Sequence, residues 1–221
     1  MKITPKELAN MIDHSQLHAD STREDIIKLA NEASEYHFKG VCVNPFWVSV
    51  ARDNLVGKKI ELVSVIGFPL GQNKTMTKVN EAKQAIEDGA TEIDMVMNIG
   101  ALKSQMFEYV ENDIRELANL GVTLKVIIET CYLFHEEKIM ACEMAKRAGA
   151  SYIKTSTGFG PFGATRKDIE LIRKVVGNDM GIKAAGGISS WQKALEMVET
   201  GADRIGASKS IQIIEDYRKN Q

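Results

Sequence analysis

The chain has 221 residues, which is near the lower size limit of a single (β/α)8 barrel and above the usual size of simpler domains, so we expect one domain over 1–221. Lysine and arginine total 28 against 30 aspartate and glutamate, and the net charge is −2. With no basic run, this composition argues against nucleic acid or an acidic membrane surface as a partner and favours a small ligand.

Eight short runs rich in valine and isoleucine predict strands. They lie at 12–17, 41–44, 62–68, 92–98, 124–129, 152–157, 182–185 and 204–207. Amphipathic segments between them predict helices at 23–38, 45–55, 78–87, 107–120, 136–148, 166–176 and 191–200. Strict alternation of strand and helix indicates a parallel sheet, and eight units indicate its closure into a (β/α)8 TIM barrel, with extra terminal helices at 5–10 and 211–219. A doubly wound open sheet is the alternative.

A weak internal repeat supports this organisation. A Gly-Ala pair leads from a helix into the next strand at Gly89, Gly149 and Gly201, and Gly40 and Gly121 occupy equivalent places. A glycine there suits a helix C-cap in the left-handed conformation, before the chain reverses into a strand.

The three cysteines are odd in number and lack CxxC spacing, which argues against a disulfide framework or a zinc site. The N-terminal segment lacks the apolar core of a signal peptide, and no stretch approaches the ~18 apolar residues of a membrane span. We therefore expect a cytoplasmic protein with reduced thiols, no membrane segment and no metal.

Two lysines, Lys154 and Lys183, lie in the middle of short β-like runs, where a solvated charge is unexpected. Two ammonium groups in a confined site disfavour each other's protonation, and desolvation acts in the same direction, so one amine can become nucleophilic near neutral pH. This is the chemistry of Schiff-base formation with a carbonyl. The alternative is that each lysine reaches solvent or forms a salt bridge at a strand end.

Alternation along the strands places Asp94 on one face of the fourth strand, Lys125 and Glu129 on one face of the fifth, and Lys154 and Lys183 on one face of the sixth and seventh. If these faces point inward, the barrel holds charges that are too costly for an ordinary core. An amine with a shifted pKa beside a carboxylate favours carbonyl or aldol chemistry. A salt-bridge network that only fills the barrel is the alternative.

The loops after the seventh and eighth strands predict a phosphate site. Gly186 and Gly187 follow one strand, and Gly206 and Ser208 end the other, while Gly158 after the sixth strand offers a further backbone amide. Phosphate commonly binds a barrel at these loops, because glycines let N–H groups approach and a helix N-terminus adds partial positive charge. A small phosphorylated substrate is expected.

Two other residues have two interpretations each. His14, beside Asp13, is either a proton shuttle or a hydrogen-bonded structural histidine. Cys42 either faces the pocket or is a small buried hydrophobe.

Short motifs lie in or beside all eight predicted strands. They are Ile12-Asp-His-Ser, Val41-Cys-Val-Asn-Pro45, Val65-Ile-Gly-Phe-Pro-Leu-Gly71, Glu92-Ile-Asp-Met-Val-Met-Asn-Ile-Gly100, Lys125-Val-Ile-Ile-Glu-Thr130, Ile153-Lys-Thr-Ser-Thr-Gly-Phe159, Ile182-Lys-Ala-Ala-Gly-Gly-Ile188 and Arg204-Ile-Gly-Ala-Ser208. Together they closely resemble the deoxyribose-phosphate aldolase family.

The resemblance implies a class I lyase, free of metal and cofactor, that reversibly cleaves 2-deoxy-D-ribose 5-phosphate into acetaldehyde and D-glyceraldehyde 3-phosphate in deoxynucleoside catabolism. It implies that Lys154 forms the Schiff base, that Lys183 perturbs it and that Asp94 is the acid/base residue. Family members commonly form homodimers or homotetramers. The resemblance assigns phosphate binding to Gly158, Gly186, Gly187 and Ser208, and a place near the substrate to Asp13 and Ser15.

The sequence departs from the family at two points. Lys209 follows Ser208 where a small residue is usual, so it either adds a cation for the phosphate or points to solvent. The C-terminus lacks the final tyrosine that some members use for proton transfer, and Tyr217 is expected to pack on the barrel instead. The rival functions are another Schiff-base phosphosugar lyase and a non-catalytic barrel that binds a phosphorylated metabolite.

Overall fold

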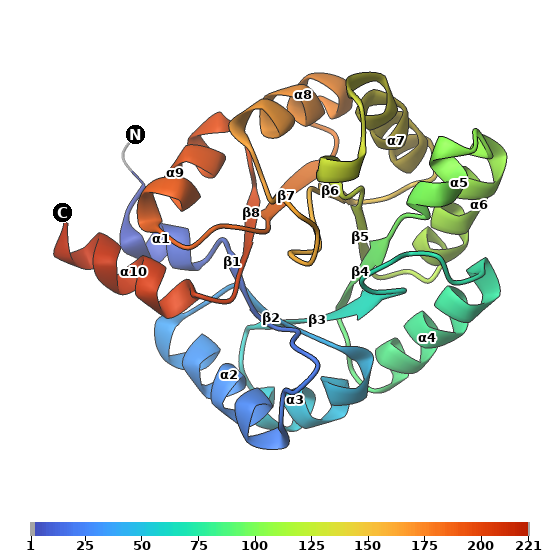
Figure 1. The fold of residues 1–221 in the computed structure, drawn as a ribbon. Helices are drawn as coiled ribbons and strands as arrows, with labels where there is room; N and C mark the ends of the chain where they lie inside the picture. Colours follow the sequence, from blue (N-terminus) through green and yellow to red (C-terminus); the bar gives the residue numbers. More distant parts are fainter. Residues whose placement is uncertain (1–2, 221) are drawn as a thin grey trace.

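The computed structural model describes residues 3–220. Within them eight strands form a closed barrel in which each strand pairs in parallel with the next, and β1 pairs with β8 (Figure 1). The predicted barrel is therefore confirmed, and the open sheet is excluded. The strands are β1 (Ile12–Gln16), β2 (Gly40–Val43), β3 (Glu61–Ile66), β4 (Glu92–Val96), β5 (Thr123–Ile127), β6 (Tyr152–Lys154), β7 (Gly181–Ala185) and β8 (Arg204–Ala207).

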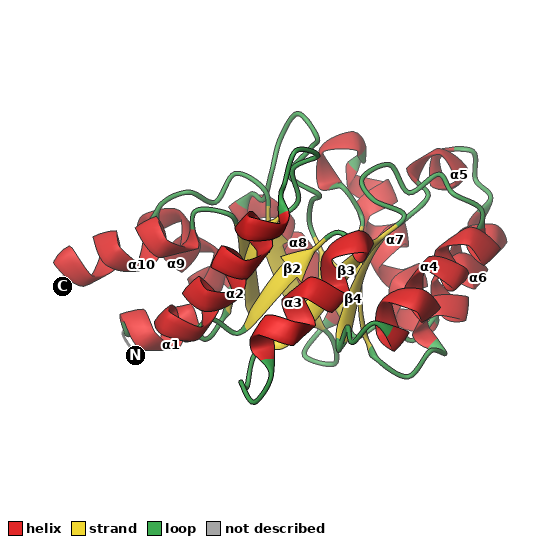
Figure 2. Cartoon of the chain, turned by 90° about the horizontal axis from the view of Figure 1, so that it is seen from below, coloured by secondary structure: helices red, strands yellow, loops and turns green. Residues whose placement is uncertain are grey.

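Helices form a ring around the strands (Figure 1), and the side view shows them in front of and beside the barrel (Figure 2). The predicted ones are α2 (Arg23–Tyr36), α3 (Val48–Leu55), α4 (Thr75–Glu87), α6 (Phe107–Ala118), α7 (His135–Arg147), α8 (Arg166–Val176) and α9 (Trp191–Thr200), with α1 (Pro5–Ala9) and α10 (Ser210–Lys219) near the two ends. The predicted segment 45–55 divides into the 3-10 turn η1 (Pro45–Trp47) and α3. Two short elements were not predicted, namely α5 (Ile99–Lys103) and the 3-10 turn η2 (Thr130–Tyr132). No helix within residues 3–220 combines the length and apolar composition needed to cross a bilayer.

The two sides of the barrel wall have opposite character. Side chains that point outward, such as Ile93, Val126 and Ile182, are fully buried against the helices in one apolar core. Complete burial of each such side chain contributes about 1.5–3 kcal/mol, so this outer layer is a large source of stability. The inward positions of β4 carry Glu92 and Asp94 instead, and these two carboxylates lie in the barrel interior.

One of the five glycines expected to cap a helix lies in a strand instead. Gly89, Gly121, Gly149 and Gly201 have the positive φ that a left-handed cap requires. Gly40, expected to do the same, is the first residue of β2. It is needed there for space, because a Cβ at Gly40 would lie 2.7 Å from Asp13 Oδ1 inside the barrel.

Several strands end before the predicted limit. The runs at 62–68, 92–98, 124–129 and 152–157 stop at Ile66, Val96, Ile127 and Lys154, because the chain turns there into buried loops at the barrel mouth. Asn98, for example, accepts a hydrogen bond from Ala101 N at 3.0 Å and caps α5. Apolar residues continue into these loops, so the strand-like sequence pattern extends beyond the last hydrogen bonds between the strands.

Candidate active site

Asp94 is the centre of a buried cluster in the barrel interior. Its Oδ2 accepts hydrogen bonds from Lys154 Nζ at 2.9 Å and Lys183 Nζ at 2.7 Å. Its Oδ1 accepts one from Lys125 Nζ at 2.9 Å. Lys154 and Lys183 are also direct neighbours in the register of β6 and β7. The prediction that these two lysines and Asp94 meet inside the barrel is therefore confirmed.

Further ion pairs close this cluster into a ring of alternating charge. Lys183 Nζ lies 2.6 Å from Asp13 Oδ2, and Arg204 bridges Asp13 and Glu92 at 2.6 and 3.0 Å. Glu92 in turn lies 2.5 Å from Lys125 Nζ. In order around the ring the residues are Asp94, Lys183, Asp13, Arg204, Glu92 and Lys125.

The charge balance of the ring shows which lysine of the pair is not needed for neutrality. Three carboxylates and three cations balance one another in it, whereas Lys154 is a seventh charge that shares Asp94 with two other ammonium groups. An isolated buried charge is very costly, and the alternation in the ring avoids that cost for its six members. Lys154 is thus the cation whose loss leaves the rest neutral.

The electrostatics of the ring keep Asp94 and Asp13 ionised. Burial alone would raise the pKa of Asp94, but the charges of Lys125, Lys154 and Lys183 hold it well below the usual range. For Asp13 burial also opposes ionisation, and the cations led by Lys183 outweigh it and lower the pKa to about 2.

The pKa of Lys183 does not shift in the direction that mutual repulsion of the two amines would give. Burial acts to lower the pKa of Lys183, yet the carboxylates of Asp13 and Asp94 outweigh it, and the pKa is raised. Lys183 therefore stays protonated at neutral pH. The two ammonium groups do not act on each other alone, because both donate to the carboxylate of Asp94, which the sequence pattern does not reveal.

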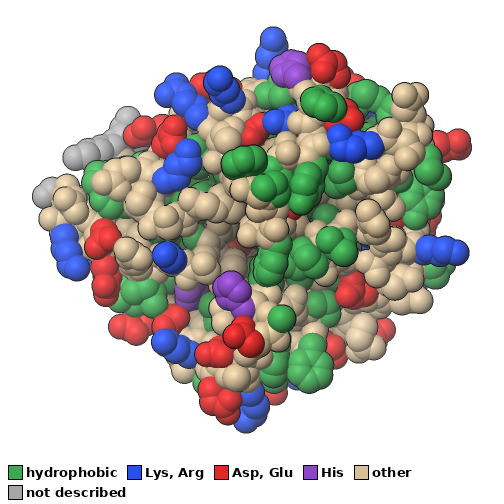
Figure 3. All heavy atoms as spheres, viewed as in Figure 1, with side chains coloured by type: hydrophobic (Ala, Val, Ile, Leu, Met, Phe, Trp, Pro, Cys, Tyr) green, Lys and Arg blue, Asp and Glu red, His purple; other side chains and the backbone are tan. Residues whose placement is uncertain are grey.

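A cavity of about 370 Å³ opens above the ring at the carboxyl ends of the strands. Figure 3 shows this face of the molecule hollowed near its centre. Lys154 is only 3% exposed but lines the cavity, whereas Lys183 is fully buried beneath it. Other lining residues that the sequence singled out are Ser15, Gly158, Gly186, Gly187, Gly206, Ser208 and Lys209.

One predicted substrate residue lies elsewhere. Asp13 is fully buried, and its carboxylate is bound by Lys183 and Arg204 in the layer below the cavity. Ser15, two residues nearer the carboxyl end of β1, is the one that reaches the cavity wall. Both residues are expected near the substrate from the sequence, because alternation shows which face of a strand a residue occupies. It does not show how far along the barrel axis the residue lies.

Gly206 supports the cluster as well as lining the cavity. A Cβ at this position would lie 3.1 Å from Lys183 Cε. The missing side chain therefore leaves room for the Lys183 ammonium to reach Asp94.

Their contacts decide between the two interpretations of His14 and of Cys42. His14 faces away from the cavity, where Nδ1 lies 3.0 Å from Ser210 Oγ and Nε2 lies 2.9 Å from Glu32 Oε2, so its role is structural. Cys42 is buried beside Val63 and Val65 inside the barrel, and burial raises the pKa of its thiol.

The C-terminal tyrosine also lies away from the cavity. Tyr217 is buried, stacks on Trp191 and donates a hydrogen bond to Ile3 O at 2.5 Å. The prediction that it packs on the barrel is confirmed.

Sequence reasoning missed two members of the ring, Glu92 and Arg204. The signal was available, because Glu92 lies two residues before Asp94 and Arg204 two residues before Gly206, each on the same inward face. Glu129 was expected in the interior beside Lys125. It lies past the end of β5 and turns toward the loop after β6 instead.

The chain is similar to known aldolases along nearly its whole length. Residues 8–211 match the DeoC/LacD family of aldolases. Deoxyribose-phosphate aldolases from Thermococcus kodakarensis and Aciduliprofundum boonei are 56% and 58% identical over 216 and 214 residues, and each alignment covers 95% of this chain and 96% of the relative. The solved structure of the deoxyribose phosphate aldolase from Aeropyrum pernix, described as a unique tetramer, has a TM-score of 0.90 at 33% identity, covering 99% of this chain and 94% of that one. From the family match and the near-complete alignments, we conclude that the chain belongs to the DeoC/LacD aldolase family.

Proposed function

We propose that this aldolase reversibly cleaves 2-deoxy-D-ribose 5-phosphate into acetaldehyde and D-glyceraldehyde 3-phosphate through a Schiff base on Lys154. The observation that carries the proposal is that Lys154 is in contact with both the cavity and the charged cluster. Lys183, the other lysine of the pair, has no surface on the cavity. The relatives that bear the name of this activity align along nearly the whole chain.

The reaction begins at the amine. Lys154 Nζ attacks the C1 aldehyde, a proton moves to the oxygen, and water leaves to form a protonated imine. A base then takes the C3 hydroxyl proton, the C2–C3 bond breaks, and its electron pair moves toward the imine nitrogen to form an enamine. Glyceraldehyde 3-phosphate departs, C2 is protonated, and water hydrolyses the remaining imine to release acetaldehyde and restore the lysine.

Asp94 is the proposed base, acting through a water molecule. Its lowered pKa keeps it ionised at neutral pH, which is the form that accepts a proton. Lys183, bound to the same oxygen, keeps a positive charge beside the reacting nitrogen. In this proposal Lys183 acts on Lys154 through that charge, while Asp94 holds both amines in place.

The phosphate is proposed to lie at the glycine-rich end of the cavity. Gly186 and Gly187 both have positive φ, and Ser208 lies in the short loop between β8 and α10. Backbone N–H groups and the N-terminus of α10 suit a dianion there. A phosphate group bound there would orient C1 of the sugar toward the amine of Lys154, and such positioning is worth several orders of magnitude in rate.

Trapping the imine tests the proposal. Acetaldehyde followed by borohydride should leave a stable adduct on Lys154, identified by peptide mass mapping, because only this amine of the pair reaches the cavity. The Lys183→Leu variant should trap more slowly and still on Lys154. An adduct on Lys183 in the wild type would overturn the assignment, and no adduct at all would favour a non-catalytic barrel that binds a phosphorylated metabolite.

Donor profiling separates this activity from that of another Schiff-base phosphosugar lyase. Glyceraldehyde 3-phosphate should condense with acetaldehyde and not with ketone donors, because the donor carbonyl must reach the amine of Lys154, which is only 3% exposed. Turnover of ketones in preference to acetaldehyde would favour the rival activity.

Lys209 gives a second prediction about the substrate. It lines the cavity next to Ser208 and precedes the first turn of α10, and we propose that its ammonium contacts the phosphate. Lys209→Ala should raise KM for 2-deoxyribose 5-phosphate by about tenfold and leave kcat nearly unchanged, as expected when a uniform binding contact is lost. Steady-state kinetics with unphosphorylated 2-deoxyribose should show no change.

The matched control is Lys174→Ala, which removes an exposed lysine from α8 and should leave both parameters as in the wild type. An unchanged KM in Lys209→Ala would assign the Lys209 ammonium to solvent.

We also propose that the chain works in the cytoplasm as a homodimer or homotetramer. The absence of a bilayer-spanning helix within residues 3–220 fits that location. The Aeropyrum pernix relative is described as a tetramer. Light scattering on the purified protein tests the assembly, and a mass of 24.5 kDa would identify a monomer.

A further inference from the structure

Glu129 has an unusual backbone and a buried side chain just beyond β5. Its φ and ψ are 47° and 67°, the left-handed region that disfavours residues with a Cβ. Its side chain is almost completely buried, at 3% exposure. The proposed reaction uses no group at this position, so both features need another explanation.

The carboxylate of Glu129 binds the loop that follows β6. Its Oε2 accepts hydrogen bonds from Thr157 N at 3.1 Å and from the Thr157 hydroxyl. Thr157 Oγ1 accepts a further bond from Phe159 N at 3.0 Å. Gly160 lies directly over the carboxylate, since a Cβ there would be 3.3 Å from Glu129 Oε1. Residues 157–160 therefore wrap around one charged group, and we call them the β6 loop.

The same segment continues to the glycine turn after β7. Ala164 N donates to the carbonyl oxygens of Ala185 and Gly186 at 3.2 and 3.0 Å. Gly163 packs so closely on Gly186 that a Cβ would lie 2.1 Å from the Gly186 oxygen. The chain from 157 to 164 thus spans the distance from Glu129 to the proposed phosphate end of the cavity.

The β6 loop supplies cavity wall, whereas Lys154 is held by other bonds. Thr157, Gly158 and Phe159 all line the cavity. Lys154 is fixed in the sheet, where its carbonyl accepts from Ile128 N at 3.1 Å and the following residue bonds to β7. Loss of the Glu129 contacts would release the wall without moving the amine.

We propose that Glu129 is a positioning residue for substrate binding, which acts by fixing the β6 loop against the phosphorylated end of the substrate. The inference rests on the proposed function, because the β6 loop has this role only if the chain binds the phosphorylated sugar of that reaction. Without the carboxylate, the N–H and hydroxyl of Thr157 lose their acceptor, and the loop no longer presents the Gly158 amide in one place. Substrate and transition state lose the same contact, so KM rises while kcat is retained.

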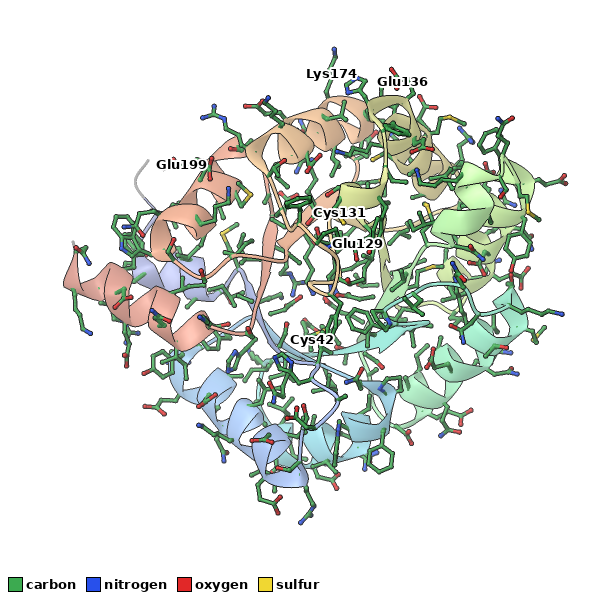
Figure 4. The ribbon with its side chains drawn as sticks, in the orientation of Figure 1. Cys42, Glu129, Cys131, Glu136, Lys174 and Glu199 are labelled. Carbon is green, nitrogen blue, oxygen red and sulfur yellow. The ribbon has the colours of Figure 1, made fainter. Side chains whose placement is uncertain are left out.

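Figure 4 shows Glu129 and Cys131 together near the barrel mouth and Glu136 on the outer edge of the molecule. Glu136 begins the exposed side of α7 and serves as the matched control. The variants to compare are Glu129→Ala, Glu129→Gln and Glu136→Gln. The Gln replacement keeps one acceptor oxygen for the Thr157 amide, so its effect should be the smaller of the two at position 129.

Glu129→Ala should raise KM for 2-deoxyribose 5-phosphate by about tenfold, with kcat within about threefold of the wild type. Its rate of acetaldehyde trapping on Lys154 should be unchanged, which also shows that the barrel is folded, because that reaction does not use the phosphate end. Glu136→Gln should match the wild type in every measurement. An unchanged KM, or a parallel fall in kcat and trapping rate, would overturn the positioning role.

A second variant keeps the test decisive if Glu129→Ala does not fold. Thr157→Val removes the hydroxyl from the other side of the contact and should raise KM in the same way. Combined with Glu129→Gln, its effect on KM should be less than the product of the two single effects, because the residues share one contact. Multiplicative effects would contradict the inference, whereas failure of the wild type to trap acetaldehyde on Lys154 would overturn the proposed function instead.

Discussion

Replacing Lys154 with methionine should lower kcat for cleavage of 2-deoxyribose 5-phosphate by about five orders of magnitude, as for other enzymes that lose their nucleophile. The reason is that the cavity offers no second amine in contact with Asp94, since Lys183 lies beneath the floor. A steady-state assay that follows release of glyceraldehyde 3-phosphate measures the effect. A Lys154→Met protein as active as the wild type would exclude the Schiff base at this position.

The stability of the same variant should be nearly that of the wild type. The six charges of the ring balance without Lys154, so its removal leaves no unpaired charge. Lys183→Met is the contrasting control, because it leaves Asp13 short of a partner and should lower the free energy of unfolding by about 3–5 kcal/mol. Urea unfolding at pH 7 would distinguish the two, and equal losses would contradict the balance.

The Asp94→Asn substitution should damage both activity and stability. It keeps the shape of the side chain but leaves three ammonium groups against a neutral amide. The free energy of unfolding should fall by about 3–5 kcal/mol, which is typical for breaking a buried ion pair. Loss of the base should lower kcat by about two to four orders of magnitude. Urea unfolding and the cleavage assay measure the two effects separately.

The stability gap between Asp94→Asn and the wild type should depend on pH. The pKa of Asp94 in the folded chain lies well below its value in the unfolded chain, because the ammonium groups outweigh the effect of burial. Its stabilisation is therefore complete above the unfolded pKa of about 3.9 and is lost as the pH falls further. The gap should be constant from about pH 7 to pH 5 and narrow below about pH 4.

A surface ion pair provides the control for the stability loss. Asp179→Asn removes a carboxylate that lies 2.8 Å from Lys146 but is 77% exposed. Such pairs contribute about 0–1 kcal/mol, so this variant should unfold almost as the wild type does. An equal loss in the two variants would mean that the burial of Asp94 adds nothing.

The strand-helix alternation of the sequence was enough to predict the barrel. Period-two alternation also placed Asp94, Lys154 and Lys183 on inward faces, because a residue's side of a strand is a local property. The depth of a residue is not local, since it depends on how neighbouring strands are shifted along one another. Asp13 was for this reason expected at the substrate, although Arg204 and Lys183 hold it in a lower layer.

The role of Glu129 shows a second limit of sequence reasoning. Continuing the alternation of β5 from Lys125 through Ile127 places Glu129 inside the barrel. One residue with positive φ ends that alternation and turns the carboxylate toward a loop about 28 positions later in the chain. No local pattern reports such a turn at a glutamate, so the contact becomes visible only in three dimensions.

The closed circuit of charges limits how this enzyme can be redesigned. Changing one member alone, to accept a different donor aldehyde, leaves its two neighbours electrically uncompensated and weakens the scaffold before any new selectivity appears. Substitutions in oppositely charged pairs keep the balance and are the safer route into the floor of the barrel. Phe159 and Lys209 are exposed residues that line the cavity at its rim, and neither belongs to the ring of ion pairs. Engineering for new acceptor aldehydes therefore belongs at the rim.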